Sequence, residues 1–301
     1  MKSYNRVVLY NSHHNGDIHY SREFARYFIK NIPANEYYFI HQNSPRLVMD
    51  IPEIKSHGPE APVEVTQKWT SLSQETHFQE IDGTLYINLW VGRNHRIYLQ
   101  NYNDCTINAN YAACQDACEQ LGLSRDIGPL ESFIPEYDYS PFNTEHIDNF
   151  INSKQNKLKV LISNGECLSG QADNFDMSPA INKLCLEYPD VIFLATNESH
   201  TLEHGYPNLY YTSDIINIQF GDLVENSYLS THCDIIVGRA SGAFCFACTK
   251  ANWISDKPVI CFSHRKEEGM WAENSTGIWT NFQNSDNLFN VIAEQLNKRS
   301  V

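Results

Sequence analysis

Short apolar runs alternate with amphipathic segments along the first half of the chain. The runs are rich in β-branched and aromatic residues, which is typical of buried strands. The predicted strands are residues 6–10, 37–40, 46–51 and 84–91. The amphipathic segments repeat apolar side chains at helical spacing. The predicted helices are residues 17–30 and 108–121. Residues 52–80 follow neither period.

The second half repeats this alternation after a segment at 125–142 that is rich in proline and glycine, which we interpret as a long connection. The predicted strands are residues 158–163, 191–196, 209–212, 234–237 and 258–262. The predicted helices are residues 144–153, 179–188, 223–230, a segment from 241, and about 286–298. Strands that alternate with helices predict parallel sheets covered by helices. We therefore predict an α/β protein with two Rossmann-like parallel-sheet domains, at 1–140 and 141–301. The last helix of the C-terminal domain could pack back on the N-terminal domain.

Charge and composition exclude several classes of protein. The 301-residue chain has a net charge of −14 and no long basic run, so we do not expect nucleic-acid binding. The longest apolar runs, such as 191–195, are far shorter than the roughly 20 residues of a membrane span. The first residues lack the apolar region of a signal peptide. We expect a cytoplasmic protein with no transmembrane segment.

The chain has nine cysteines, an odd number, and most lie in apolar segments. This pattern is typical of buried, reduced thiols. Cys114 and Cys118, or Cys245 and Cys248, could each supply two metal ligands, but no second pair at zinc spacing completes a site. No Asp-x-Asp sequence occurs in a loop after a predicted strand. We therefore expect no metal and no other cofactor.

Ligands of parallel α/β sheets bind beyond the carboxyl ends of the strands, so the loops there are the candidate sites. Residues 11–17 form the first such loop, and they are densely polar. His13 and His14 are candidate proton carriers near neutral pH. Asp17 is a candidate general base, and Asn15 a candidate acceptor ligand. The alternative is that Asp17 only caps the helix and that the histidines are ordinary loop residues.

The loop at 163–176 combines glycines with small hydrogen-bond donors, a composition that suits backbone N–H contacts with phosphate. The candidate ligands are Asn164, Gly165, Ser169, Gly170 and Gln171. The loop matches neither the P-loop nor the dinucleotide fingerprint. A solvated crossover loop is the alternative.

The turn at 238–242 follows a predicted buried strand and precedes a predicted helix. A helix N-terminus offers unpaired N–H groups and partial positive charge to phosphate. The candidate ligands are Gly238, Arg239, Ser241 and Gly242. An ordinary strand–turn–helix packing unit would have the same pattern.

Two further loops carry charge. Arg93 and His95 lie in a basic cluster at 91–96 that could meet an anionic acceptor group. Arg265 could contact phosphate from the loop at 263–272, and Glu267 and Glu268 could accept hydrogen bonds from ribose. Either loop could equally be a solvated surface turn.

These motifs together resemble GT-B-fold glycosyltransferases of the heptosyltransferase-like branch. The resemblance rests on Asn15-Gly-Asp17, on Gly165 with Ser169-Gly-Gln171, and on Val237 to Gly242. It implies two Rossmann-like domains facing a central cleft, with the acceptor on the N-terminal domain and a nucleotide-sugar on the C-terminal one. The chain departs from the family in being short. It also lacks a clean copy of the acidic ribose motif, for which Glu267 and Glu268 are only approximate matches.

The resulting hypothesis is a metal-independent, inverting glycosyltransferase of the hexosyl or pentosyl type that acts in glycan biosynthesis. It would move a sugar from a nucleotide-sugar to a hydroxyl of a glycan or small saccharide, with Asp17 as base and His13 or His14 as rivals. Two alternatives remain open: a nucleotide-sugar epimerase and a non-catalytic nucleotide- or sugar-binding protein.

Overall fold

A computed structural model gives the structure of the chain. It describes residues 2–11, 14–41, 45–55, 78–90, 106–168, 170–199, 201, 205–216, 222–255, 257–264, 277–280 and 283–299. Within these residues the chain forms two compact units, which divide between Pro141 and Phe142. Each unit has its own sheet, and the two are described separately below.

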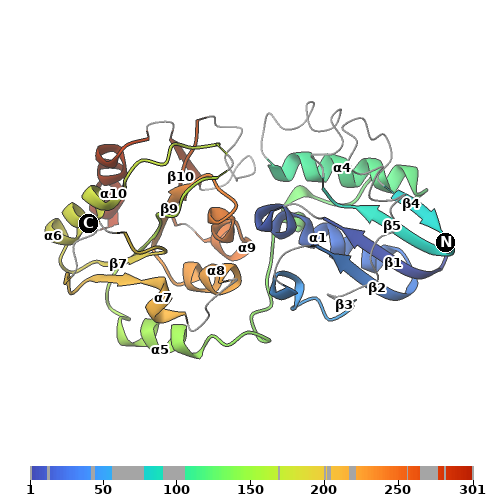
Figure 1. Ribbon diagram of the computed structural model, residues 1–301, viewed down its shortest axis with the longest axis horizontal. Helices are drawn as coiled ribbons and strands as arrows, with labels where there is room; N and C mark the ends of the chain where they lie inside the picture. The colour runs from blue at the N-terminus through green and yellow to red at the C-terminus, as the bar shows by residue number, and fades with distance from the viewer. Residues whose placement is uncertain are drawn as a thin grey trace. The chain divides into compact units, whose positions relative to one another are not determined.

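The first unit is built on a five-stranded sheet in the order β3-β2-β1-β5-β4 (Figure 1). Its elements are β1 (Tyr4–Tyr10), α1 (Asn15–Asn31), β2 (Ala34–Ile40), the 3₁₀ helix η1 (Pro45–Val48), β3 (Ile54–Lys55), β4 (Phe78–Ile81), β5 (Thr84–Asn88), α4 (Thr106–Gln120) and the 3₁₀ helix η3 (Leu130–Phe133). All neighbouring strands pair in parallel except β4 and β5, which form an antiparallel hairpin. The predicted parallel sheet is therefore present with one antiparallel edge.

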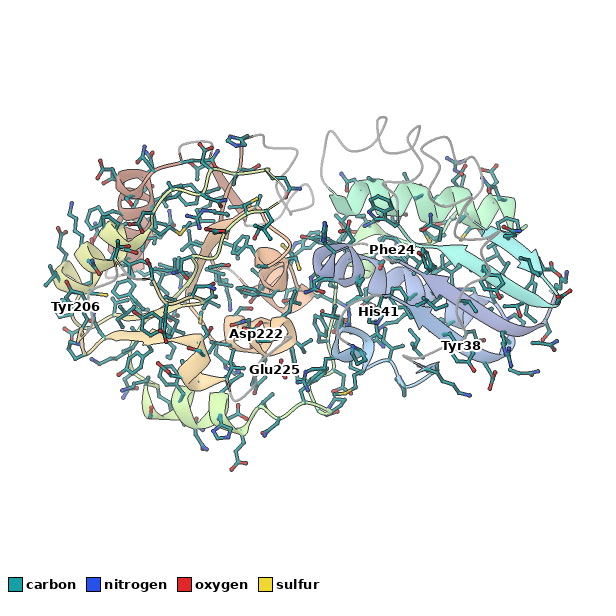
Figure 2. All side chains as sticks on the ribbon, in the orientation of Figure 1. Phe24, Tyr38, His41, Tyr206, Asp222 and Glu225 are labelled. Carbon is teal, nitrogen blue, oxygen red and sulfur yellow. The ribbon has the colours of Figure 1, made fainter. Side chains whose placement is uncertain are left out.

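Side chains on both faces of this sheet are buried. Val7 and Leu9 point to one face of β1, and Val8 points to the other, where it packs with Tyr38 and Tyr86. Helices α1 and α4 pack against each other. Phe24 of α1, labelled in Figure 2, stacks on Phe133 of η3, and the ring centroids are 4.7 Å apart. The middle of the long connection is thereby part of the first unit's core.

The strand predicted at 46–51 is wrong. The segment forms η1, and its Leu47 and Val48 are buried. Pro45 favours a turn at its start, and the Leu47 carbonyl accepts a hydrogen bond from Arg22 Nη1 at 2.7 Å, so it is not free to pair in a sheet. A short apolar run does not distinguish a buried strand from a buried turn.

The second unit is built on a six-stranded, fully parallel sheet in the order β11-β10-β9-β6-β7-β8. Its elements are α5 (Glu145–Ser153), β6 (Lys159–Ser163), α6 (Ser178–Glu187), β7 (Ile192–Ala195), β8 (Leu209–Tyr211), α7 (Thr212–Ile215), α8 (Leu223–Thr231), β9 (Ile235–Arg239), the 3₁₀ helix η4 (Phe244–Ala247), α9 (Lys250–Ile254), β10 (Val259–Phe262), β11 (Gly277–Thr280) and α10 (Ser285–Arg299). The predicted two-sheet α/β fold class is confirmed.

Helices cover both faces of this second sheet. The last helix, α10, packs beside α6, and its Leu288, Ile292 and Leu296 are fully buried in this unit's core (Figure 1). Helices α8 and α9 lie on the other side of the sheet from α6 and α10 in Figure 1. Buried residues therefore follow one another without alternation along β6, β7 and β9, as expected for strands covered on both faces.

The helix predicted from Ser241 is also wrong. Strand β9 continues through Gly238 to Arg239, and the chain then makes a turn and the four-residue 3₁₀ helix η4. The Phe244 N–H donates to the Ser241 hydroxyl at 3.2 Å, a local side-chain bond that closes the turn leading into η4. No α-helix begins at this turn, so the helix-dipole argument for phosphate does not apply here.

Candidate functional site

Each sheet has one point where the strand order reverses. In the second unit, β6 is followed by β7 and β8 on one side, and β9 returns to pair on the other side. In the first unit, β1 is followed by β2 and β3, and β5 returns to the opposite side of β1. Such switch points open a crevice at the carboxyl ends of the two central strands. The loops after β6 and β9, and those after β1 and β5, are therefore the candidate sites.

Arg239 joins the two loops at the switch point of the second unit. It is the last residue of β9, and its side chain is buried, with the residue only 3% exposed. Nε donates to the Asp173 carbonyl at 2.9 Å, and Nη2 donates to the Phe175 carbonyl. Nη1 donates to the carbonyls of Asn164 and Gly165 at 2.9 and 2.8 Å. Burial lowers the pKa of the Arg239 guanidinium.

The loop after β6 is also braced by its own side chains. The Cys167 N–H donates to Asn174 Oδ1 at 2.7 Å, and Asn174 Nδ2 donates back to the Cys167 carbonyl at 3.1 Å. Cys167 Sγ donates to the carbonyl of Ala240, in the loop after β9, at 3.2 Å. Asn164 Nδ2 donates to the Asn197 carbonyl at 2.7 Å. These bonds give the loop a defined shape.

The turn after β9 presents backbone donors. Among the described residues, the N–H groups of Ser241, Gly242 and Ala243 have no hydrogen-bond acceptor. Consecutive N–H groups in a turn can bind an anion without needing a helix. Ser241 is buried, whereas Gly242 is partly exposed and Ala243 is exposed. The turn can therefore supply the donors that the sequence assigned to a helix end.

Gly238 lies under this turn, inside β9. A Cβ atom at this position would lie 2.4 Å from Phe244 Cδ2 and 2.8 Å from the Cβ of Ser163. Phe244 is fully buried. The glycine is therefore required so that Phe244 can pack against the strand.

A polar cluster lies beside these loops at the ends of β10 and β11. The His264 N–H donates to the Gln171 carbonyl at 2.9 Å, and His264 Nδ1 lies 2.9 Å from Gln283 Nε2. His264 Nε2 is 3.6 Å from Asp173 Oδ1. The Asp173 N–H donates to Gln283 Oε1. Gln171, one of the predicted ligands, thus meets the end of β10 through its backbone.

At the switch point of the first unit, Asp17 and Trp90 connect the two loops. The indole Nε1 of Trp90, which follows β5, donates to Asp17 Oδ1 at 3.1 Å. Asp17 is partly buried in the first turn of α1, which begins at Asn15 with His14 as its N-cap residue. Asp17 is therefore not the N-cap, and its carboxylate lies where the two loops meet. Asn15 Oδ1 is buried and has no hydrogen-bond partner in the described part of the chain.

Several predicted site residues lie outside the described residues. They are His13, Arg93, His95, Ser169, Arg265, Glu267 and Glu268. Gly170 is exposed, and its φ of 73° is in the left-handed region that favours glycine. Sequence reasoning missed Trp90, Asn174 and Gln283. Trp90 sits at the end of a predicted strand, and Asn174 lies within the predicted loop at 163–176, so both could have been found by position, but Gln283 carries no local signal.

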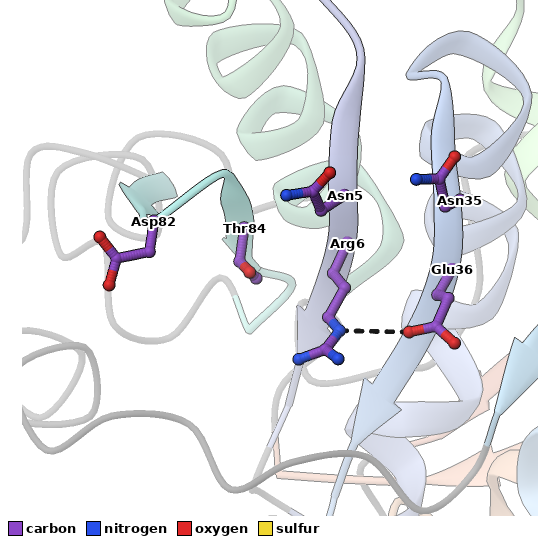
Figure 3. Close-up of a pocket in the computed structure, with 6 residues that line it drawn as sticks. All are labelled: Asn5, Arg6, Asn35, Glu36, Asp82 and Thr84. Carbon is purple, nitrogen blue, oxygen red and sulfur yellow. Dashed lines mark hydrogen bonds and ion pairs between the residues drawn. The ribbon is translucent and has the colours of Figure 1, made fainter.

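A separate cavity of about 590 Å³ lies at the amino ends of β1, β2 and β5 in the first unit, which is the opposite end of these strands from the candidate site (Figure 3). Its lining residues are polar or charged, and Arg6 Nε donates to Glu36 Oε2 at 3.1 Å across it. Hydrogen bonds from Lys55, Tyr38 and Arg6 lower the pKa of the Glu36 carboxyl to about 2. Because Arg6 and Glu36 are paired with each other there, we assign no ligand to this cavity.

Metal ligands and membrane spans were sought in the described part of the chain. No group of three or more histidine, cysteine, aspartate or glutamate side chains there could hold a metal ion. Among the same residues, no helix has the length and apolar character needed to cross a bilayer. All eight described cysteines are buried, and none of them forms a disulfide.

No family model and no curated protein matches this sequence. Solved structures do match its fold. A family 9 glycosyl transferase from Veillonella parvula is 12% identical, with a TM-score of 0.54 and coverage of 97% of this chain and 89% of that one. E. coli heptosyltransferase WaaC with ADP-2-deoxy-2-fluoro heptose is 10% identical, with a TM-score of 0.54 and coverage of 96% and 99%. A putative UDP-N-acetylglucosamine 2-epimerase from Listeria monocytogenes is 10% identical, with a TM-score of 0.51 and coverage of 98% and 88%. These likenesses, with the two sheets described above, show that the chain has a GT-B-type fold.

Proposed function

We propose that the protein is a glycosyltransferase that moves a sugar from a nucleotide-sugar donor to a hydroxyl of a carbohydrate acceptor without a metal ion. The observation that carries the proposal is the row of backbone donors at Ser241, Gly242 and Ala243, placed at a switch point of the sheet. The fold supports it, because the solved structures that share it include glycosyltransferases.

In this proposal, the second unit binds the nucleotide diphosphate. Negative charge grows on the diphosphate as the bond to the sugar breaks. Fixed N–H donors stabilise that charge without reorganising at the moment of reaction. The turn at 241–243 and the loop at 164–171 would supply those donors in place of a metal ion.

The first unit would bind the acceptor and hold the base. The Asp17 carboxylate would take the proton of the acceptor hydroxyl while the hydroxyl oxygen attacks the anomeric carbon of the donor. The bond from that carbon to the diphosphate breaks in the same displacement, which inverts the configuration. The Trp90 indole N–H donates to Asp17 Oδ1 and so would help to hold the carboxylate in place for this role. His14 is exposed at the N-cap and is the described rival for this role.

An epimerase that acts on a nucleotide-sugar alone is the second candidate. It is favoured by the likeness to a putative 2-epimerase, which has the same fold over 98% of this chain. The two functions differ in their need for an acceptor. Incubating the protein with the donor alone would convert the sugar if it is an epimerase and would leave it unchanged if it is a transferase.

Nucleotide binding is the first test. The melting temperature is measured with ADP, UDP, GDP and CDP, because a ligand held by the folded state raises stability by mass action. We expect at least one nucleoside diphosphate to raise it, in the presence of EDTA as well as without it. If none does, the donor site is wrong. If binding or turnover requires added manganese or magnesium, the metal-independent mechanism is wrong.

Replacing the proposed base gives the second test. We expect Asp17→Asn and Asp17→Ala to lower turnover by about 10²- to 10⁴-fold, the usual contribution of a general base, with the nucleotide affinity unchanged. Steady-state transfer and isothermal titration measure the two quantities. The control is Asp190→Asn, whose carboxylate is fully exposed in the second unit. Turnover like that of the unmodified protein in Asp17→Asn would remove Asp17 from the mechanism.

A further inference from the structure

We propose that Arg239 is a positioning residue, which turns the backbone N–H groups of Gly165 and Glu166 outward to bind the donor diphosphate. This inference rests on the function proposed above. It assigns Arg239 a different task from the direct phosphate contact that the sequence suggests.

The first step is that the guanidinium already has its partners. Its three nitrogens donate to four backbone carbonyls between residues 164 and 175. Its planar group also lies over the ring of Phe175, with 4.9 Å between Cζ and the ring centroid. A direct contact with phosphate would have to compete with these bonds. In the described structure, the cation lies behind the loop and not on its surface.

The second step is the geometry of the peptide group. In a trans peptide, the carbonyl of one residue and the N–H of the next point in opposite directions. No described peptide bond is cis. Because the carbonyls of Asn164 and Gly165 point to Arg239, the N–H groups of Gly165 and Glu166 point away from it. Among the described residues, neither of these two N–H groups has a hydrogen-bond acceptor.

The third step concerns the glycine itself. A Cβ on Gly165 would lie 2.9 Å from Asn197 Oδ1, so the backbone is held closely between Asn197 and Arg239. Asn197 is itself bonded through its N–H to Asn164 Oδ1 at 2.8 Å. The two peptide groups are therefore oriented from both sides. The outward N–H groups would add to those of Ser241 to Ala243, on the neighbouring loop of the same switch point.

Lysine and methionine at position 239 distinguish positioning from direct contact. Lysine keeps the charge but has a single ammonium group and cannot hold four carbonyls in the planar arrangement of the guanidinium. We therefore expect Arg239→Lys and Arg239→Met to weaken binding of the nucleoside diphosphate found by the melting screen by a similar factor, about 10- to 100-fold. Arg125→Lys, at an exposed arginine of the first unit, is the matched control.

Amide hydrogen exchange reports the orientation directly. In the unmodified protein, the nucleoside diphosphate should protect the amides of Gly165 and Glu166, and in Arg239→Lys this protection should be lost. If Arg239→Lys keeps affinity within about threefold while Arg239→Met loses it, Arg239 contacts the phosphate directly and the inference is overturned. Unchanged affinity in both variants also overturns it.

A second pair of variants covers the case in which Arg239 variants do not fold. Glu166→Pro removes one outward N–H, and Glu166→Ala keeps it. We expect only the proline variant to weaken nucleoside diphosphate binding, and equal affinity in the two variants contradicts the inference. If the unmodified protein binds no nucleoside diphosphate, the proposed function fails. If it binds one and Arg239→Lys binds equally well, only the positioning role fails.

Discussion

At the scale of single residues, buried arginines hold loops in place in both units. Arg22 of α1 is fully buried and bonds Asp50, Leu47 and Glu136. Nη2 donates to Asp50 Oδ2, and Nε and Nη2 donate to the Glu136 carbonyl at 3.1 and 2.9 Å. Its guanidinium lies over the ring of Tyr137, with 3.6 Å from Cζ to the centroid. Arg22 and Arg239 thus act in the same way, as fixed forks that bind carbonyls of segments far away in the sequence.

We expect Arg22→Met to lower the free energy of unfolding by about 3–5 kcal/mol, because it leaves the buried Asp50 carboxylate without its main partner. The double variant Arg22→Met/Asp50→Leu should recover part of this loss, since it removes the unpaired charge. Denaturant titrations followed by circular dichroism measure both. Arg125→Met at the surface should change stability by less than about 0.5 kcal/mol. A double variant less stable than Arg22→Met would show that Asp50 is not the cause.

At the scale of elements, local turn chemistry accounts for the hairpin that the sequence prediction missed. Strands β4 and β5 are joined by Asp82 and Gly83, with φ angles of 49° and 75°. Two residues with positive φ are typical of the tight hairpin turn that favours Asp-Gly. The Asp-Gly pair stands in the sequence between the residues of β4 and those of β5. It could have been used to predict an antiparallel hairpin at the edge of the sheet.

We expect Gly83→Ala to destabilise the protein by about 1 kcal/mol or more, because a Cβ is strained at this φ. It would also lie 3.0 Å from Asn5 Nδ2 in β1. Asp82→Asn is the control, since asparagine tolerates positive φ. The change in unfolding midpoint measures both variants. A Gly83→Ala protein as stable as Asp82→Asn would indicate that the turn adopts another conformation in solution.

At the scale of the whole molecule, the chain consists of two units, each with its own sheet and switch point, and only the second sheet is fully parallel. One hydrophobic cluster of the second unit runs from Val160 to Leu296 and consists of residues of that unit. We therefore expect that a substitution within the second unit can lower the stability of that unit and leave the sheet of the first unit intact.

Gly238→Ala tests this separation. It overpacks β9 against Phe244 and should cost about 1–3 kcal/mol. We expect faster amide exchange in β6, β9 and β10, with exchange in β1 and β5 unchanged. The variant Gly238→Ala/Phe244→Leu should recover part of the lost protection, because it makes room for the added methyl group. An equal increase of exchange in both sheets would mean that the chain unfolds as one cooperative body.

The local sequence pattern was sufficient to locate most strands and long helices. The spacing of apolar residues and the length of an apolar segment depend only on residues that are neighbours in the sequence. It also located the loops after β1, β6 and β9 as candidate sites, since a parallel sheet gathers them at one edge. Pattern failed at η1 and η4, where buried apolar segments form turns. It could not show the role of Arg239, whose acceptors lie 64 to 75 residues away in the sequence. It could not pair Asp17 with Trp90, 73 residues apart, either. Such contacts depend on which strands become neighbours, and strand order is a property of the folded chain that no local period records.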